Sequence, residues 1–187
     1  MSNFSGKGGL AGETYEEVYK SFQWQLPKIY NIGVDVCDKW ANDPGRVALI
    51  HVGENDVERI VTFHELKKQS NRLANTLKAN GIAKGDRIGI LLPQSPETLI
   101  AHIAAYKLGA IALPLLTLFR SMALEYRLKD SGATCVITDA DNLPNLLELN
   151  ERVPQLKLIL AVAASSRKGV LNFWDSLALA RDRFEPV

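Results

Sequence analysis

The sequence is poor in cysteine and has no excess of either charge. Its two cysteines, Cys37 and Cys135, lie far apart without CxxC spacing, so we expect buried structural thiols instead of a metal site or a redox pair. The 22 basic and 21 acidic residues give a formal net charge of +1 without a block of like charge. This balance predicts no electrostatic contact with nucleic acid or with an anionic membrane.

Long apolar runs are also missing. The first twelve residues have no apolar core of the kind that a secretory signal needs, and no later run approaches the roughly 18 apolar residues of a membrane span. We therefore expect a soluble protein in the cytoplasm. The 187 residues, 47% of them hydrophobic, are enough for one domain with a real core.

The common catalytic motifs are absent as well. The chain has no GxGxxG after a strand, no GxSxG, no HExxH and no GxxxxGK[ST]. Dinucleotide oxidoreductases, hydrolases, metalloproteases and P-loop NTPases therefore lose support. The three histidines, His51, His64 and His102, are dispersed without a recognisable partner, and we expect solvated or structural roles for them. The sequence thus predicts neither catalytic nor metal-binding residues within the chain.

What the sequence does contain is a regular alternation of β-prone and helical segments. Residues 1–27 are expected to form an N-terminal extension, and residues 28–187 an α/β domain. Apolar strands are predicted at 87–92, 111–116, 134–138 and 156–162, after a hairpin at 47–52 and 57–62. Strands that are apolar throughout and separated by single helices favour a mostly parallel, doubly wound sheet flanked by helices.

Several helix ends can be predicted from local chemistry. Thr62 and Glu65 are spaced as a capping box at the start of an amphipathic helix that closes at Gly81. Ser95 and Ser121 are predicted to cap the next two helices, which end at Gly109 and Gly132. An earlier helix at 31–43 is expected to pack on the core through its apolar positions, namely Ile32, Val36 and Trp40.

One loop is a candidate binding site. Residues 116–121, with Thr117, Leu118, Phe119 and Arg120, follow a predicted parallel strand and precede a helix. Crevices of open α/β sheets lie at such loops. Free amides at the helix N-terminus, together with Arg120, can attract a phosphate group. The alternative is an exposed arginine without a ligand.

Several segments in the right order resemble the adenylate-forming enzymes. VTFHELKKQSNRLAN (61–75), GIAKGDRIGILLPQSPE (81–97) and YKLGAIALPL (106–115) are similar to core segments of that superfamily. NIGVDVCDKWAND (31–43) and LTLFRSMALEYRLKDSGA (116–133) narrow the resemblance to acyl-CoA synthetases of the acetyl-CoA and medium-chain type. The resemblance covers the chain from about residue 24 to its end.

This resemblance implies a two-step ligase reaction. A carboxylic acid reacts with ATP and Mg²⁺ to give an acyl-adenylate and pyrophosphate, and the thiol of CoA then attacks the adenylate. The resemblance also implies that Thr117, Leu118, Phe119 and Arg120 approach CoA. It places the phosphate loop, the metal-binding acid and the mobile lysine beyond Val187. We therefore expect an N-terminal fragment, truncated before the phosphate loop, that is inactive alone and binds none of these cofactors tightly.

Other hypotheses remain open at this point. The parent could be an acyl-AMP ligase or the adenylation domain of a peptide synthetase. The chain could instead be a non-catalytic, standalone binding module with a polar exterior. A fragment should show a large exposed apolar surface, through which it could form a homodimer.

Overall fold

The computed structural model describes residues 13–23, 27–53, 56–149, 151–163 and 169–187. The chain divides into two compact units, Met1–Tyr30 and Asn31–Val187. In the first unit, α1 (Tyr15–Ser21) begins with a capping box, in which Thr14 and Glu17 bond each other's main-chain amides. Residues 1–12 and 24–26 of the predicted extension lie outside the described residues.

The second unit begins with two short helical turns in place of the single helix predicted at 31–43. These are α2 (Ile32–Val36) and the 3-10 helix η1 (Asp38–Trp40), which are separated by the irregular backbone of Cys37. The prediction that Ile32, Val36 and Trp40 face the core is wrong, because all three are substantially exposed and the buried residues are Gly33, Cys37 and Ala41. The cause is close packing: a Cβ atom at Gly33 would lie 2.7 Å from Cγ of Lys107 on the neighbouring helix.

An antiparallel hairpin follows, as predicted. It consists of β1 (Val47–Val52) and β2 (Glu58–Thr62), with Ile50 opposite Ile60 and an irregularity between Val47 and Leu49. Because side chains alternate along a strand, Leu49 and Val61 pack inward while Ile50 and Ile60 point outward.

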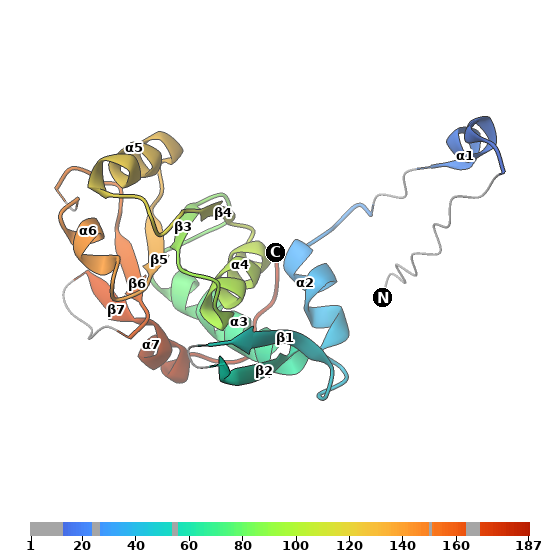
Figure 1. Ribbon diagram of the computed structural model, residues 1–187, viewed down its shortest axis with the longest axis horizontal. Coiled ribbons are helices and arrows are strands. Elements are labelled where there is room, and N and C mark those ends of the chain that lie inside the picture. The colour runs from blue at the N-terminus through green and yellow to red at the C-terminus, as the bar shows by residue number, and fades with distance from the viewer. Residues whose placement is uncertain (1–12, 24–26, 54–55, 150, 164–168) are drawn as a thin grey trace. The chain divides into compact units, whose positions relative to one another are not determined.

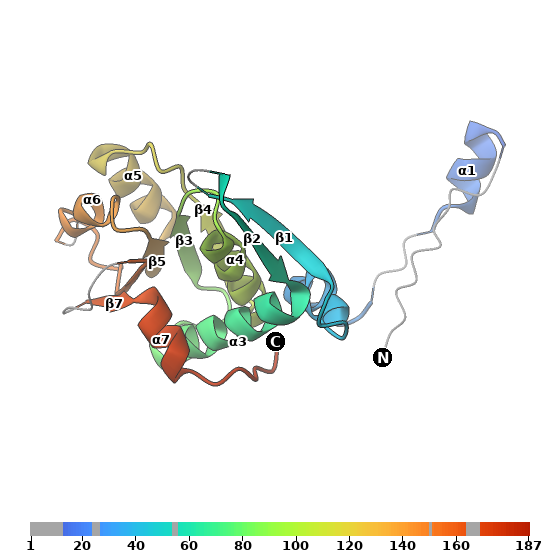
Figure 2. The ribbon, with the colours of Figure 1, turned by 60° about the horizontal axis from the view of Figure 1, so that its bottom comes forward.

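The body of the unit is a five-stranded parallel sheet in the order β4-β3-β5-β6-β7 (Figures 1 and 2). Its strands are β3 (Arg87–Leu91), β4 (Ile111–Pro114), β5 (Cys135–Thr138), β6 (Leu158–Ala161) and β7 (Val170–Asn172). Its helices are α3 (Phe63–Ala79), α4 (Pro96–Leu108), α5 (Ser121–Ser131), α6 (Leu143–Leu147) and α7 (Phe173–Leu179). The predicted parallel α/β fold with a small hairpin is confirmed, although the three-residue β7 was not predicted.

The sheet is apolar on both faces, and each face has its own core. Ile88, Ile90 and Ile137 pack with α3, α4 and α7, whereas Leu91, Val136 and Ile159 pack with α5 and α6. Alternate residues of one strand thus enter different cores. This two-sided burial explains why the strands are continuously apolar in the sequence.

The helices begin close to the predicted positions, but the side-chain capping bonds differ from those predicted. Thr62 accepts a hydrogen bond from the Glu65 amide at 3.2 Å, but the Glu65 carboxylate pairs with Arg59 instead of closing a capping box. Ser95 occupies the N-cap of α4 without a side-chain capping bond. The prediction that Ser121 caps α5 is wrong, since Arg120 is the N-cap residue.

Candidate functional site

The strand order creates a crevice position at the carboxyl edge of the sheet. β3 is followed by α4 on one face, while its neighbours β4 and β5 are followed by α5 and α6 on the other face. The chain therefore leaves adjacent strands in opposite directions, and ligands of open α/β sheets bind at such a switch point. The predicted loop 116–121 lies at this edge, directly after β4.

The four predicted site residues differ in how available they are. Thr117 is half-buried, and Leu118 is 84% exposed. Phe119 packs against the core beneath α5, and the guanidinium carbon of Arg127 lies 4.0 Å from its ring centroid. Arg120 is exposed, and its main-chain carbonyl accepts a bond from the Leu124 amide. Leu118 and Arg120 are thus free for a ligand, whereas Phe119 is committed to packing.

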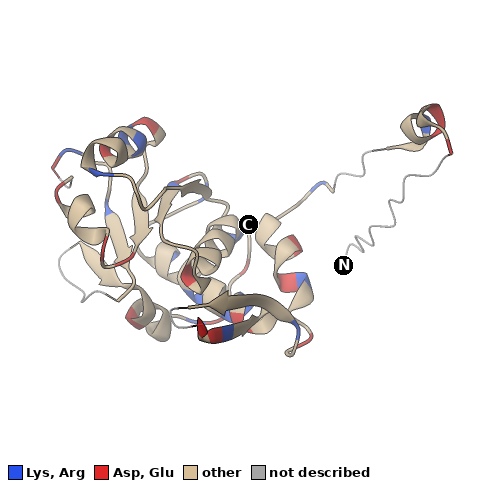
Figure 3. Cartoon of the chain, viewed as in Figure 1, with Lys and Arg blue, Asp and Glu red and all other residues tan. Residues whose placement is uncertain are grey.

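The charge at the start of α5 is mixed. The Ser121 hydroxyl donates to the Glu148 carboxylate at 3.0 Å, which places a negative charge beside the helix N-terminus. Arg120 has no ion-pair partner within the described part of the chain. Figure 3 shows basic and acidic residues together on α5, where the pKa of Glu125 is lowered by its hydrogen bond to Lys129. Arg120 is therefore the group that can recruit a phosphate, opposed by Glu148.

The loop after β5 holds polar groups that sequence reasoning missed. Asp139 accepts hydrogen bonds from the main-chain amide of Asn142 at 2.8 Å and from its side chain at 3.0 Å. Thr138 is fully buried, and its hydroxyl has no partner among the described residues. The available signal was the position of Thr138 and Asp139 at the end of an apolar strand. These residues shape the switch point but form no acid–base pair.

A buried lysine was also missed. Lys107 is fully buried in α4, and its Nζ lies 2.6 Å from Asp38 Oδ1, 2.7 Å from Asn71 Oδ1 and 2.9 Å from Ser70 Oγ. Burial lowers the pKa of Lys107 below its ordinary value, and the neighbouring Asp38 opposes this shift. Burial also raises the pKa of the Cys37 thiol to about 12. This network joins α3, α4 and η1, and within it only Asp38 keeps slight access to solvent while Lys107, Ser70 and Asn71 are buried.

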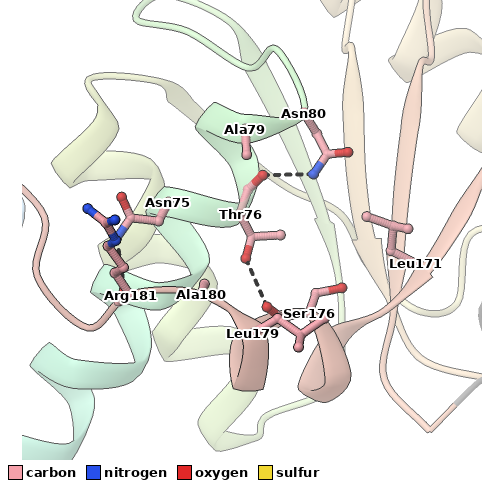
Figure 4. A pocket seen from close by; sticks show the side chains of 9 residues that line it. All are labelled: Asn75, Thr76, Ala79, Asn80, Leu171, Ser176, Leu179, Ala180 and Arg181. Carbon is pink, nitrogen blue, oxygen red and sulfur yellow. Dashed lines mark hydrogen bonds between the residues drawn. The ribbon is translucent and has the colours of Figure 1, made fainter.

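A cavity of about 490 Å³ lies between α3, β7 and α7 (Figure 4). Its polar side chains are mostly engaged with the protein itself. Thr76 Oγ1 donates to the Ser176 carbonyl, Asn80 Nδ2 donates to the Thr76 carbonyl, and Asn75 Nδ2 donates to the Arg181 carbonyl. Among the residues that the structure describes, no carboxylate, histidine or cysteine lines the cavity. The cavity therefore has the size of a ligand site without the groups of a catalytic centre.

The described residues offer neither a metal site nor a membrane-spanning helix. They contain no group of three or more His, Cys, Asp or Glu side chains that could hold a metal ion. They also contain no helix that is both long and apolar enough to cross a membrane. The three histidines do not converge on one site, and the ring of His102 bonds the Thr98 carbonyl of its own helix at 2.9 Å.

Comparison with known proteins gives a consistent result. Residues 37–184 match the family described as AMP-binding enzyme. The chain is 30% identical over 175 residues to the mitochondrial acyl-coenzyme A synthetase ACSM3 of Mus musculus, which covers 90% of this chain and 30% of that protein. It is 32% identical over 177 residues to the acetyl-coenzyme A synthetase of Bacillus subtilis (strain 168), covering 86% and 30% of the two chains.

Solved structures show the same similarity. The acyl-CoA synthetase of Brucella canis superposes with a TM-score of 0.82 and 29% identity, over 92% of this chain and 33% of the other. The anthranilate CoA ligase AuaEII, solved in complex with anthranoyl-AMP, gives a TM-score of 0.74 and 28% identity over 87% and 30%. The chain thus spans 30% of the length of both curated relatives.

Proposed function

Because this chain belongs to the AMP-binding enzyme family, we propose that it is the N-terminal α/β portion of an ATP-dependent acyl-CoA synthetase, which is an acid–thiol ligase. In the complete reaction a carboxylate attacks the α-phosphorus of ATP and releases pyrophosphate. The thiol of CoA then attacks the acyl carbon and releases AMP. Fatty acid metabolism is the corresponding proposed context, with a small-molecule carboxylic acid as substrate. A location in the cytoplasm stays a prediction.

The observation that supports this proposal most is the large share of the chain that the relatives match. Relatives described as acyl- or acetyl-coenzyme A synthetases match 81% to 90% of this chain at about 30% identity. Two solved structures, an acyl-CoA synthetase and a CoA ligase, share its fold at 29% and 28% identity. Short motifs can recur by chance, whereas an ordered match over most of a domain points to common ancestry and a related reaction.

Within such an enzyme, this unit acts as a scaffold with a few CoA contacts. Arg120 is exposed at the switch point and can pair with a phosphate of CoA. Leu118 offers an exposed apolar side chain beside it, and Thr117 offers a half-buried hydroxyl. Phe119 supports the loop from below through its packing on Arg127. The proposed contact set is therefore Thr117, Leu118 and Arg120, with Phe119 in a supporting position.

The isolated chain is proposed to be inactive. The sequence has nothing like the Thr-Ser-Gly-Thr-Thr-Gly-x-Pro-Lys loop that stabilises the triphosphate in this family. Negative charge on ATP repels an incoming carboxylate unless cations offset it. Purified protein given ATP, Mg²⁺ and a series of carboxylic acids should release no pyrophosphate. Release that scales with protein concentration and vanishes without the acid would contradict this proposal.

CoA binding can be tested directly on the same protein. Millimolar CoA should shift the amide NMR signals of residues 116–122 and leave those of β6 and β7 unchanged. ATP with Mg²⁺ should shift no defined cluster, because the chain lacks the phosphate loop. An absence of CoA-dependent shifts in the loop, or shifts that persist in Arg120→Ala, would argue against the contact set.

The alternatives differ in what they require. An acyl-AMP ligase or a peptide-synthetase adenylation domain would show the same fold but no CoA-dependent shifts. A standalone binding module should have a polar exterior, yet Ile50 and Ile60 lie opposite each other at 55% and 56% exposure, with Val52 beside them. This apolar hairpin face supports a unit that is covered by a partner. In the absence of the remaining enzyme, we propose a second copy as that partner.

A further inference from the structure

The last segment of the chain crosses the molecule as a strap. Residues 181–187 leave α7 and run along α3 toward the end of α4 without joining a strand (Figure 2). This strap includes two exposed arginines, Arg181 and Arg183, followed by Phe184 and Val187. Because it pairs with no strand, other contacts must hold it in place.

Asparagine side chains hold the strap by its main-chain carbonyls. Asn75 Nδ2 donates to the carbonyls of Arg181 at 2.8 Å and Arg183 at 2.9 Å. One turn earlier on α3, Asn71 Nδ2 donates to the Asp182 carbonyl at 2.9 Å. All three bonds are accepted by main-chain carbonyls, so this part of the contact does not depend on which side chains the strap carries.

The far end of the strap is held by a junction at Asn31. Its Nδ2 donates to the Val187 carbonyl at 2.8 Å, while its Oδ1 accepts from the Val34 amide and caps α2. The Val187 amide donates to the Lys107 carbonyl at 3.1 Å. The Val187 side chain occupies the space beside Gly109, where a Cβ atom would lie 2.7 Å from it.

Side-chain specificity comes from two positions. Phe184 packs against the core that α3 and α4 share, with Lys78 Nζ 6.0 Å from its ring centroid. Val187 fills the space at Gly109. The only ion pair of the strap within the described residues, Lys68 with Asp182, is long at 3.8 Å and exposed, so it contributes little. The surface under the strap, which includes Asn31, Asn71, Asn75 and Gly109 and is called the groove below, therefore favours an extended peptide with phenylalanine three residues before valine.

The groove is held in shape by contacts other than the strap. The Asn71 Oδ1 accepts from the buried Lys107 Nζ at 2.7 Å, which fixes the direction of the amide donor. Asn31 also donates to the carbonyls of Tyr106 and Lys107 at the end of α4. Receptor groups that are fixed in this way lose little freedom when a peptide docks on them.

We propose that residues 181–187 form a releasable strap, which opens as a unit while the sheet stays folded, and that the emptied groove binds the same peptide in trans. The strap is joined to the body mainly by side-chain bonds and one aromatic ring, not by a strand ladder. Segments with few buried contacts open locally before the core does. This inference does not depend on CoA, ATP or the proposed ligase reaction.

Trypsin can report the opening, because Arg181 and Arg183 lie inside the strap. In the full 187-residue chain, Asn75→Ala should raise the initial rate of cleavage after Arg183 about tenfold, since two hydrogen bonds to the strap are lost. Asn145→Ala on α6, which makes no contact with the strap, is the matched control and should cleave at the wild-type rate. Equal rates for Asn75→Ala and wild type would overturn the proposal.

A second experiment needs no variant of the protein. A synthetic peptide spanning residues 180–187 with Arg181→Gln and Arg183→Gln resists trypsin and keeps the backbone, Phe184 and Val187. At several millimolar, which is comparable to the effective concentration of a tethered segment, it should raise cleavage of the wild-type strap several-fold. The same peptide with Phe184→Ala should have no effect. No acceleration, or equal acceleration by both peptides, would refute binding in trans.

Discussion

At the scale of single residues, Lys107 is the most constrained side chain in the molecule. Its ammonium group has four oxygen partners, from Asp38, Ser70, Asn71 and the main chain of Lys67. Nothing in the local sequence distinguishes it from an exposed lysine, because its burial depends on three separate segments meeting. Ser121 failed as a predicted cap for a similar reason, because its hydroxyl bonds Glu148, which is distant in sequence. Ser95 is the N-cap residue of α4 as predicted, but its hydroxyl lies 3.5 Å from the Thr98 hydroxyl and makes no capping bond.

Replacing Lys107 with methionine should destabilise the protein by about 3 kcal/mol, because removing one member of a buried ion pair leaves the other without compensation. Asp38 keeps slight access to solvent, so the loss should lie at the lower end of the usual range. Urea unfolding provides the measurement. In the double variant Lys107→Met/Asp38→Asn most of the loss should be recovered, and additive losses would contradict the coupling.

Cys37 should make stability fall at alkaline pH. Folding raises the pKa of its thiol from 9.0 to about 12 through burial, so between these values the unfolded chain releases a proton that the folded chain retains. Its stabilising contribution is therefore complete below pH 9 and is lost as the pH rises toward 12, by at most about 1.4 kcal/mol per pH unit. The pKa of Lys107 is lowered by burial, which has the opposite effect: below pH 10.5, its contribution makes the protein more stable as the pH rises.

The difference between wild type and Cys37→Ala reports mainly this effect, because burial and Asp38, the larger causes of the Lys107 shift, are common to both proteins. Chemical denaturation at several pH values should show Cys37→Ala less stable than wild type at pH 7 and the gap closing above pH 9. A gap that stays constant up to pH 11 would show that the thiol is not protected by burial.

The neighbours Leu118 and Phe119 should respond differently to truncation. Phe119→Ala should cost about 1–2 kcal/mol, because the ring packs on the core and on Arg127. Leu118→Ala should stay within about 0.5 kcal/mol, since this side chain is largely exposed. Thermal unfolding of the two variants makes the comparison. Similar losses would mean that the loop is packed in another way.

At the scale of elements, periodicity predicted the long helices and the buried strands well. It failed where an element is short or its packing is set by a neighbour. Cys37 interrupts the helix predicted at 31–43, and close approach to α4 selects the side with Gly33 over the more apolar side. β7 has three residues, too few for a periodic signal. These outcomes depend on tertiary contacts, which a single sequence does not display.

Substitutions at the start of α3 can test the two bonds of the predicted capping box separately. Thr62→Ala should cost about 1 kcal/mol, because the hydroxyl bonds the Glu65 amide at the helix N-terminus. Glu65→Gln should cost less than about 0.5 kcal/mol, since its carboxylate pairs with Arg59 at the surface. Equal losses in urea unfolding would instead support a reciprocal capping box in solution.

At the scale of the whole molecule, the sheet with two apolar faces could be predicted from sequence, whereas the exposed members of the proposed CoA contact set could not. Its residues were chosen by resemblance and by the position of the loop after a parallel strand. The structure then separated Arg120 and Leu118, which are exposed, from Phe119, which is packed. That distinction depends on the path of the loop over α5, and no pattern in the sequence specifies it.

The outward face of the hairpin provides the last prediction. Ile50 and Ile60 form a directly opposed, half-exposed pair, and burying such a pair against a second copy is favourable at roughly 25 cal/mol per Å² of apolar surface. Light scattering after size exclusion should show a dimer that dissociates on dilution. Ile60→Lys should abolish the dimer without lowering the unfolding midpoint, because the residue points away from the core. Leu179→Lys, an equally drastic change at an exposed site on α7, should leave the dimer intact. If both variants dissociate, the surface involved is not the hairpin, and if neither does, the apolar face has no role in association.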